Sequence, residues 1–367
     1  MKAFSWLFFY AFVYTNAFSQ ITKTAADNSA IIYHGRTMTN KGVVALVSSA
    51  SYAEFQFAGD SCVVGLGNVS SPGDYNYVGI ELDNQYKGRI KVANANVYGY
   101  VVRVMQKRPW HLVRIYKATE AQNGLVTVNY VGAFKLKPIA ETVKRKIEFI
   151  GNSITCGFGD DDKEIPCNNG SKWYDQHNAY WSYASRIARS LHVDYMLSAI
   201  SGAGIYRNWN SDGPTVPQQY ESAYLRFDST ERWNFENYVP DVVVIALGTN
   251  DLSGGDGKTS RNPFDSTIFV DTYVQFLKII CGHYVNTQIV LVTSPMLNGE
   301  KAKKLLSCLQ AIRMSLTRQS ISPHALKIFE FKPMHPTGCD GHPSILEHEE
   351  MANELLPFMK KVMKELN

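Results

Sequence analysis

From Lys146 onward, short apolar runs alternate with amphipathic stretches, and this alternation constrains the fold more than any other feature of the chain. The apolar runs are nearly continuous, as in strands buried on both faces, whereas the stretches between them have helical periodicity. Strands that alternate with helices form a parallel sheet covered by helices on both sides. The sequence therefore predicts an α/β domain with three layers (α/β/α) and a five-stranded sheet. The predicted strands are KIEFIG, VDYMLSAIS, PDVVVIALG, TQIVLVTSP and ALKIFEF, and the predicted helices cover residues 180–192, 264–284, 300–318 and 344–365.

A different pattern occupies residues 30–137, where polar and β-branched residues alternate over short segments. Turn signals separate these segments, such as SPGD at 71–74 and QNG at 122–124. Short alternating strands joined by turns predict an antiparallel sandwich or jelly roll. Pattern and composition both change between residues 137 and 145, which favours a domain boundary there. We therefore predict a β-sandwich domain over residues 20–140 and an α/β domain over residues 141–367.

The first residues have the features of a secretory signal peptide. One lysine precedes an apolar centre from Ala3 to Tyr14, and small residues flank the expected cleavage after Ser19. The apolar stretch is too short to span a bilayer, and no other segment is long and apolar enough. The prediction is a leader over residues 1–19 and an exported protein, extracellular or periplasmic, without a membrane anchor.

An oxidising compartment permits disulfides among the six cysteines. Cys156 and Cys167 bracket an acidic loop, and this is the candidate pair, with free thiols expected for Cys62, Cys281 and Cys308. The absence of a CxxC pair argues against a zinc or redox motif. A net charge of +4 over 367 residues, with the basic residues dispersed, argues against a nucleic-acid partner.

Four polar loops follow elements of the α/β half. The first three follow strands of one parallel sheet, so they are expected at the same edge, and the fourth lies before the last helix. They are Gly151-Asn152-Ser153, Ser201-Gly202-Ala203-Gly204, Gly248-Thr249-Asn250-Asp251 and Cys339-Asp340-Gly341-His342-Pro343.

These residue types suit acyl transfer by a serine nucleophile. A serine hydroxyl needs a base, which His342 can provide for Ser153. The oxyanion needs preorganised donors, and the N–H groups of Ser153 and Gly202 and the side-chain amide of Asn250 can supply them. Asp340 can hold the imidazole in the required tautomer.

The strings GNSITCGFG, SGAG, GTND and DGHPS, in this order, resemble the four blocks of the SGNH (GDSL-like) hydrolase superfamily. The closer resemblance is to family-2 carbohydrate esterases, in which a jelly-roll domain precedes the SGNH domain. This resemblance implies a metal-independent serine esterase without a cofactor, which removes O-acetyl groups from polysaccharides or oligosaccharides of the acetyl xylan and glucomannan type. It implies 6-O-acetyl hexoses as substrates.

Two positions depart from the superfamily pattern. Asn152 stands where the first block commonly has aspartate, and a structural role is expected for it. The usual acid lies three residues before the histidine, where this chain has Cys339. Asp340 is the available substitute, although some family-2 esterases orient the histidine with a main-chain carbonyl. Both a Ser-His-Asp triad and a Ser-His dyad are therefore open.

Several residues offer alternative assignments. A literal GDS at residues 59–61 lies between two strands with no helix after it, which predicts a hairpin turn. His335 precedes a turn and is the rival base, and Gly204 is the alternative to Gly202 as donor. Among the tryptophans near the loops (Trp181, Trp209 and Trp233), Trp209 is the candidate for a sugar-facing ring.

The acidic run at residues 160–162 is expected to be a solvated loop rather than a metal site. The alternative functions are a lipase or thioesterase on an SGNH scaffold and a non-catalytic carbohydrate-binding protein.

Overall fold

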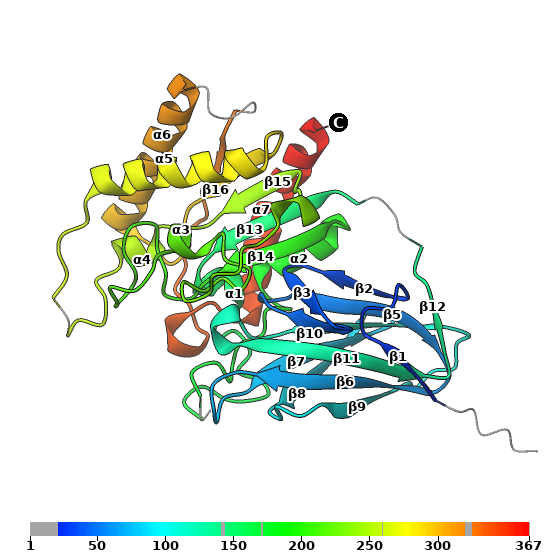
Figure 1. Cartoon of the computed structure of the whole chain (residues 1–367). Coiled ribbons are helices and arrows are strands. Elements are labelled where there is room, and N and C mark those ends of the chain that lie inside the picture. Colours follow the sequence, from blue (N-terminus) through cyan, green and yellow to red (C-terminus); the bar gives the residue numbers. More distant parts are fainter. Residues whose placement is uncertain (1–20, 141–143, 170–171, 259, 320–324, 367) are drawn as a thin grey trace, which may run out of the picture.

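The computed structural model describes residues 21–140, 144–169, 172–258, 260–319 and 325–366. In it an all-β domain packs against an α/β domain (Figure 1). The predicted leader lies outside the described residues. The predicted boundary between residues 140 and 141 adjoins residues outside that range and stays a prediction. No helix in the described ranges is long and apolar enough to cross a membrane.

The N-terminal domain consists of two six-stranded antiparallel sheets packed face to face, which confirms the predicted sandwich. One sheet has the order β3-β4-β11-β6-β9, with β1 also paired to β11. The other has the order β12-β5-β10-β7-β8, with β2 also paired to β5. The strands are β1 Thr22–Ala25, β2 Ile31–His34, β3 Thr37–Asn40, β4 Val43–Leu46, β5 Tyr52–Ala58, β6 Ser61–Val69, β7 Asn76–Leu82, β8 Gln85–Val92, β9 Tyr98–Arg103, β10 His111–Lys117, β11 Leu125–Ala133 and β12 Lys135–Lys137.

The sandwich core follows from the alternation in its strands. Phe55 and Val113 face one another across β5 and β10, and both are fully buried. Val126 and Val128 of β11 contribute from the opposite sheet to the same core. Burying a side chain of this kind stabilises the fold by about 1.5–3 kcal/mol. The sandwich is therefore a domain with its own hydrophobic core.

The C-terminal domain has a five-stranded parallel sheet in the order β14-β13-β15-β16-β17. The chain passes from β13 to β14 on one side and then returns to β15 on the other side of β13. The carboxyl ends of these strands therefore open on a crevice where the strand order reverses, which is the usual place for a site in such sheets. The strands are β13 Lys146–Gly151, β14 Asp194–Ala199, β15 Val242–Ile245, β16 Gln288–Val292 and β17 Lys327–Phe329.

Helices cover both faces of this sheet, as predicted. One hydrophobic cluster joins the sheet to α5 and α6, and a second joins its other face to α2 and α7 (Figure 1). Short helices occupy the loops between these elements. The helices are α1 Ser153–Cys156, α2 Tyr183–Leu191, α3 Val216–Gln219, α4 Thr249–Leu252, α5 Ser266–His283, α6 Gly299–Gln319 and α7 Ile345–Glu365, with 3-10 turns η1 Ala121–Asn123, η2 Phe235–Asn237 and η3 Cys339–Gly341.

Arg36 anchors the sandwich to the α/β domain. Its guanidinium is fully buried and donates to the main-chain oxygens of Tyr220 at 3.0 Å and Ser222 at 2.7 Å. It also donates to Ser198 Oγ at 3.2 Å, and Glu148 lies 3.9 Å away. A buried cation is stable only when its donors have partners, and these partners exist only when the two domains are docked.

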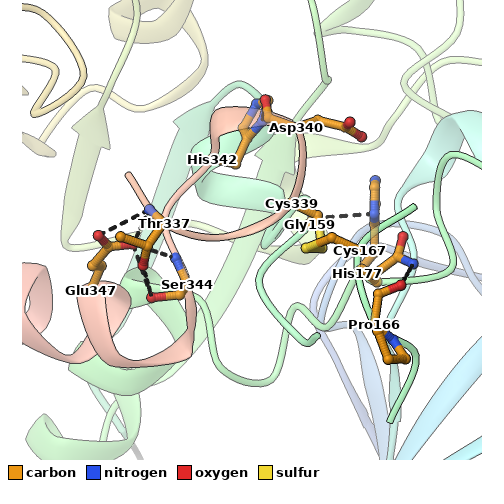
Figure 2. The surroundings of a disulfide bond; sticks show 11 residues. Gly159, Pro166, Cys167, His177, Thr337, Cys339, Asp340, His342, Ser344 and Glu347 are labelled. Atoms are coloured by element: carbon orange, nitrogen blue, oxygen red, sulfur yellow. Dashed lines mark hydrogen bonds between the residues drawn. A yellow bond between two sulfur atoms is a disulfide. The ribbon is translucent and has the colours of Figure 1, made fainter. Parts of the chain in front are cut away.

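A disulfide joins Cys167 to Cys339, so the predicted pairing of Cys156 with Cys167 is wrong (Figure 2). Cys156 is a buried free thiol in α1, and its Sγ faces the carboxylate of Glu120 at 3.5 Å. Cys62 and Cys308 are buried free thiols as predicted, and Cys281 is a half-buried one. The sequence neighbourhood of Cys156 suggested a local bridge, whereas folding brings Cys167 beside a residue 172 positions away.

We predict that Cys167→Ser lowers the free energy of unfolding by about 2–5 kcal/mol, because the bridge closes a very long loop of the unfolded chain. Chemical denaturation under oxidising conditions measures this change. Cys281→Ser, which removes a free thiol, is the matched control and should leave the stability almost unchanged. Equal stability of the Cys167→Ser variant and the native protein would contradict the prediction.

Candidate active site

Ser153 lies where β13 ends and the chain turns into a helix. The turn requires glycine at Gly151, because a Cβ there would lie 2.1 Å from Thr155 Oγ1. Asn152 caps α1, since its side-chain oxygen accepts a hydrogen bond from the Ile154 N–H at 3.1 Å. Asn152 thus has the structural role expected for it. Ser153 is the first residue of α1, with 7% of its surface exposed at the edge of the sheet.

His342 reaches Ser153 from the loop before α7. Its Nε2 lies 2.9 Å from Ser153 Oγ, and its Nδ1 lies 3.1 Å from the main-chain oxygen of Asp340. Because a carbonyl oxygen can only accept, Nδ1 carries the proton, and Nε2 is free to accept from the serine hydroxyl. The two residues therefore have the geometry of a nucleophile beside its base.

Asp340 contributes its main-chain carbonyl and not, as predicted for a triad, its carboxylate. The residue has a φ of +52° within η3, and its side chain is exposed. Figure 2 shows the carboxylate extending away from the imidazole of His342. The two-residue spacing in sequence allowed either arrangement, and the left-handed backbone of Asp340 decides for the carbonyl.

Burial favours the neutral form of His342. The Phe158 ring lies against the imidazole with a centroid separation of 4.2 Å. Burial lowers the pKa of His342 to about 4, although the hydrogen bond to Asp340 acts in the opposite direction. The imidazole is therefore neutral at neutral pH and can accept a proton.

The loop after β14 presents the Gly202 N–H. Gly202 has a φ of +73°, a left-handed conformation that favours glycine. Within the described ranges, no hydrogen-bond acceptor is paired with the N–H of Gly202 or of Ser153. The Gly204 N–H, by contrast, donates to Asn208 Oδ1 at 3.2 Å. Between the two predicted donors, Gly202 is therefore the one whose N–H is available.

Asn250 connects the loop after β15 to the loop after β14. Its side-chain nitrogen donates to the Ala203 oxygen at 2.8 Å, and its second N–H is left for another acceptor. The buried carboxylate of Asp251 accepts from the N–H groups of residues 205–207 at 2.9–3.3 Å. These bonds hold the two loops together, so the candidate donors have a fixed relative position.

Trp209 is the predicted tryptophan that lies beside this loop with an exposed ring. It is 44% exposed, and its backbone N–H donates to the Gly202 oxygen at 2.7 Å. It lines a cavity of about 370 Å³ together with residues 200–203. Trp233 is buried beneath the Arg36 guanidinium, and Trp181 packs edge-on against an aromatic neighbour.

The rival residues lie outside this arrangement. Ser61 is the first residue of β6, and its hydroxyl donates to Asp60 Oδ1 at 3.0 Å. It lies between two strands as predicted, but the predicted hairpin is wrong, because β5 and β6 belong to different sheets. His335 is exposed, and no hydrogen bond connects it to Ser153 in the described part of the chain. Of the two candidate histidines, His342 is therefore the one that is hydrogen-bonded to Ser153.

The prediction of a solvated acidic loop is wrong for Asp160 and Asp161, which are buried. Asp160 accepts from the Asn178 N–H at 2.9 Å, and Asp161 accepts from the Asn178 side chain at 2.8 Å. These hydrogen bonds explain how the carboxyl groups can be buried. Among the described residues, no group of three or more His, Cys, Asp and Glu side chains could hold a metal ion.

Sequence reasoning missed two buried residues beneath the site, Glu120 and His177. Glu120 comes from the sandwich, and one of its carboxylate oxygens lies 3.5 Å from His177 Nε2. The His177 ring packs against Phe158 with a centroid separation of 4.3 Å, and the same Phe158 ring contacts His342. Nothing near Glu120 in the sequence indicates that it lies close to the site, because its partners lie in the other domain.

Comparison with known proteins identifies both parts of the chain. Residues 149–318 match the GDSL-like Lipase/Acylhydrolase family, and residues 33–137 match the Carbohydrate esterase 2 N-terminal family. An acetylxylan esterase / glucomannan deacetylase of Cellvibrio japonicus is 28% identical over 259 residues, which is 69% of this chain and 67% of that protein. Cellulase/esterase CelE of Acetivibrio thermocellus is 31% identical over 345 residues, which covers 91% of this chain but only 40% of CelE.

Solved structures extend the similarity to the whole fold. The structure of a family two carbohydrate esterase from Clostridium thermocellum, in complex with cellohexaose, has a TM-score of 0.80 and 28% sequence identity. The match covers 91% of this chain and 99% of that one. The chain therefore carries a GDSL-like hydrolase domain behind a carbohydrate esterase 2 N-terminal domain, and it is similar along most of its length to family-2 carbohydrate esterases.

Proposed function

We propose that the protein is a serine esterase that removes O-acetyl groups from carbohydrate through an acyl-enzyme on Ser153. The observation that carries this proposal is the 2.9 Å hydrogen bond between Ser153 Oγ and His342 Nε2. The similarity to acetylxylan esterases and glucomannan deacetylases supports the acetyl group and the carbohydrate substrate.

Acylation begins when Ser153 attacks the carbonyl carbon of the acetyl ester. His342 Nε2 takes the hydroxyl proton, and the Asp340 carbonyl stabilises the resulting imidazolium through Nδ1–H. The N–H groups of Ser153 and Gly202 and the second N–H of Asn250 are the proposed donors to the oxyanion. His342 then passes its proton to the leaving sugar hydroxyl, and acetyl-Ser153 remains.

Deacylation repeats these steps with water as the nucleophile. The neutral imidazole accepts a proton from the attacking water, and the same three donors stabilise the second oxyanion. Collapse of this intermediate returns the proton to Ser153 Oγ and releases acetic acid, which ionises to acetate in water. The proposed reaction uses only groups of this chain and water.

The finer substrate assignment is an O-acetyl group on a polysaccharide or oligosaccharide of the acetyl xylan or glucomannan type, and where the sugar is a hexose, as in glucomannan, the 6-O-acetyl group. The cavity beside Gly202, with Trp209 at its wall, offers an aromatic surface for a sugar ring. We further propose that the protein is exported. The disulfide between Cys167 and Cys339 supports this, because such bonds persist in oxidising compartments.

Ser153→Ala should reduce hydrolysis of 4-nitrophenyl acetate to the background rate, because no nucleophile remains to form the acyl-enzyme. Initial rates and the melting temperature are measured together, so that a folded but inactive variant is recognised. Ser61→Ala, which changes the serine of the literal GDS at residues 59–61, is the matched control and should retain full activity. Comparing acetyl with octanoyl esters tests the acyl group, and faster turnover of octanoyl esters would favour a lipase instead.

Asp340→Asn should retain kcat within about threefold, because asparagine keeps the main-chain carbonyl and tolerates the left-handed backbone. Loss of a true triad carboxylate lowers kcat by roughly 10⁴-fold. Steady-state kinetics on 4-nitrophenyl acetate distinguish these outcomes. A loss near the larger value would mean that the Asp340 carboxylate, and not its carbonyl, orients His342 during turnover.

The pH dependence of kcat/KM should reflect the low pKa of His342. Only the neutral imidazole accepts a proton, and burial lowers its pKa to about 4, so activity should stay level from pH 7 down to about pH 5. Below about pH 4 it should fall tenfold per pH unit. Assaying samples at pH 7 after acid exposure separates protonation from irreversible unfolding. A midpoint near the ordinary histidine value of 6.5 would contradict this prediction.

A further inference from the structure

The sandwich domain holds the main chain of Ser201, in the α/β domain, through both of its polar groups. Gln122, in the η1 turn of the sandwich, donates from Nε2 to the main-chain oxygen of Ser201 at 3.0 Å. Glu120, two residues earlier, accepts from the Ser201 N–H at 2.8 Å. Both polar groups of the Ser201 main chain are thus bonded to side chains of the other domain.

The bond to the Ser201 oxygen also determines the direction of the next N–H. The Ser201 C=O and the Gly202 N–H belong to one planar trans peptide, in which they point in opposite directions. Gln122 therefore holds the Gly202 N–H on the side away from itself. Gly202 has a left-handed φ of +73°, and a glycine without such restraints has access to many other conformations.

The hydrogen bond between the Ser201 N–H and the buried carboxylate of Glu120 is a rigid restraint. Glu120 is fully buried, and although burial opposes its ionisation, His177 and the Ser201 N–H keep the pKa of its carboxyl group below the usual range. Lys117 Nζ, also buried, donates to the main-chain oxygen of Glu120 at 2.7 Å. The Glu120 carboxylate accepts from the Ser201 N–H and its main-chain oxygen accepts from Lys117, so this buried residue has little freedom to move.

We propose that Gln122 and Glu120 are positioning residues for the Gly202 N–H, so that the sandwich domain completes the oxyanion hole of the α/β domain. This inference rests on the proposed function, because it assigns the Gly202 N–H to the oxyanion. The sandwich then has a role in catalysis itself, apart from any contact it makes with a polysaccharide.

Gln122→Ala tests the proposal in the full-length protein, since the side chain is exposed and its loss should not affect folding. We expect kcat on 4-nitrophenyl acetate to fall about tenfold, less than the roughly 100-fold cost of losing a donor altogether, with KM unchanged. Gln122→Glu should behave in the same way, because a carboxylate cannot donate to the Ser201 carbonyl. Labelling of Ser153 by a fluorophosphonate should slow by a similar factor.

Gln106→Ala is the matched control, an exposed glutamine at the opposite end of β10, and it should leave kcat unchanged. 4-Nitrophenyl acetate carries no sugar. If Gln122 acted only in binding carbohydrate, Gln122→Ala would therefore keep the native kcat on 4-nitrophenyl acetate and would only raise the KM for acetylated oligosaccharides. That result would overturn the proposal. An inactive native protein would instead refute the proposed function, and the inference with it.

Discussion

The hydrogen bond between Ser153 and His342 is the contact on which the candidate active site depends, and it joins residues 189 positions apart in the chain. The sheet presents the serine at the end of β13, where Gly151 permits the tight turn into α1. His342, by contrast, does not directly follow a strand of the sheet, so other contacts must hold its loop in place. The disulfide at Cys339 and the Glu347 carboxylate, which accepts from the Thr337 and Ser344 N–H groups, supply them (Figure 2).

A main-chain carbonyl as the partner of His342 has a distinct electrostatic consequence. It carries a dipole and no net charge, so it stabilises an imidazolium less than a carboxylate does. Together with burial against Phe158, this leaves the pKa of His342 at about 4. The carbonyl also does not titrate, and its direction is determined by the backbone of η3. The orientation of the imidazole is thus determined by the fold of the loop.

The two domains are joined by buried polar groups that find hydrogen-bond partners across the interface. Arg36 from the sandwich donates into the α/β domain, and Glu120 accepts from it. Removing one partner of such a buried charge is costly, which favours a single relative orientation of the domains. A fixed orientation is what the proposed positioning of Gly202 by the sandwich requires.

The sequence by itself determined the two fold classes and the four loops, because strand and helix periodicity and glycine at a strand end are local properties of the chain. It also predicted Ser153 and His342 as partners, because a serine nucleophile needs a base and the four loops in their order resemble those of SGNH hydrolases. Tertiary structure alone decided that Asp340 uses its carbonyl, that Cys167 pairs with Cys339, and that Glu120 and Gln122 reach Ser201. These contacts depend on how distant elements pack against one another, and no local pattern of residues encodes that geometry.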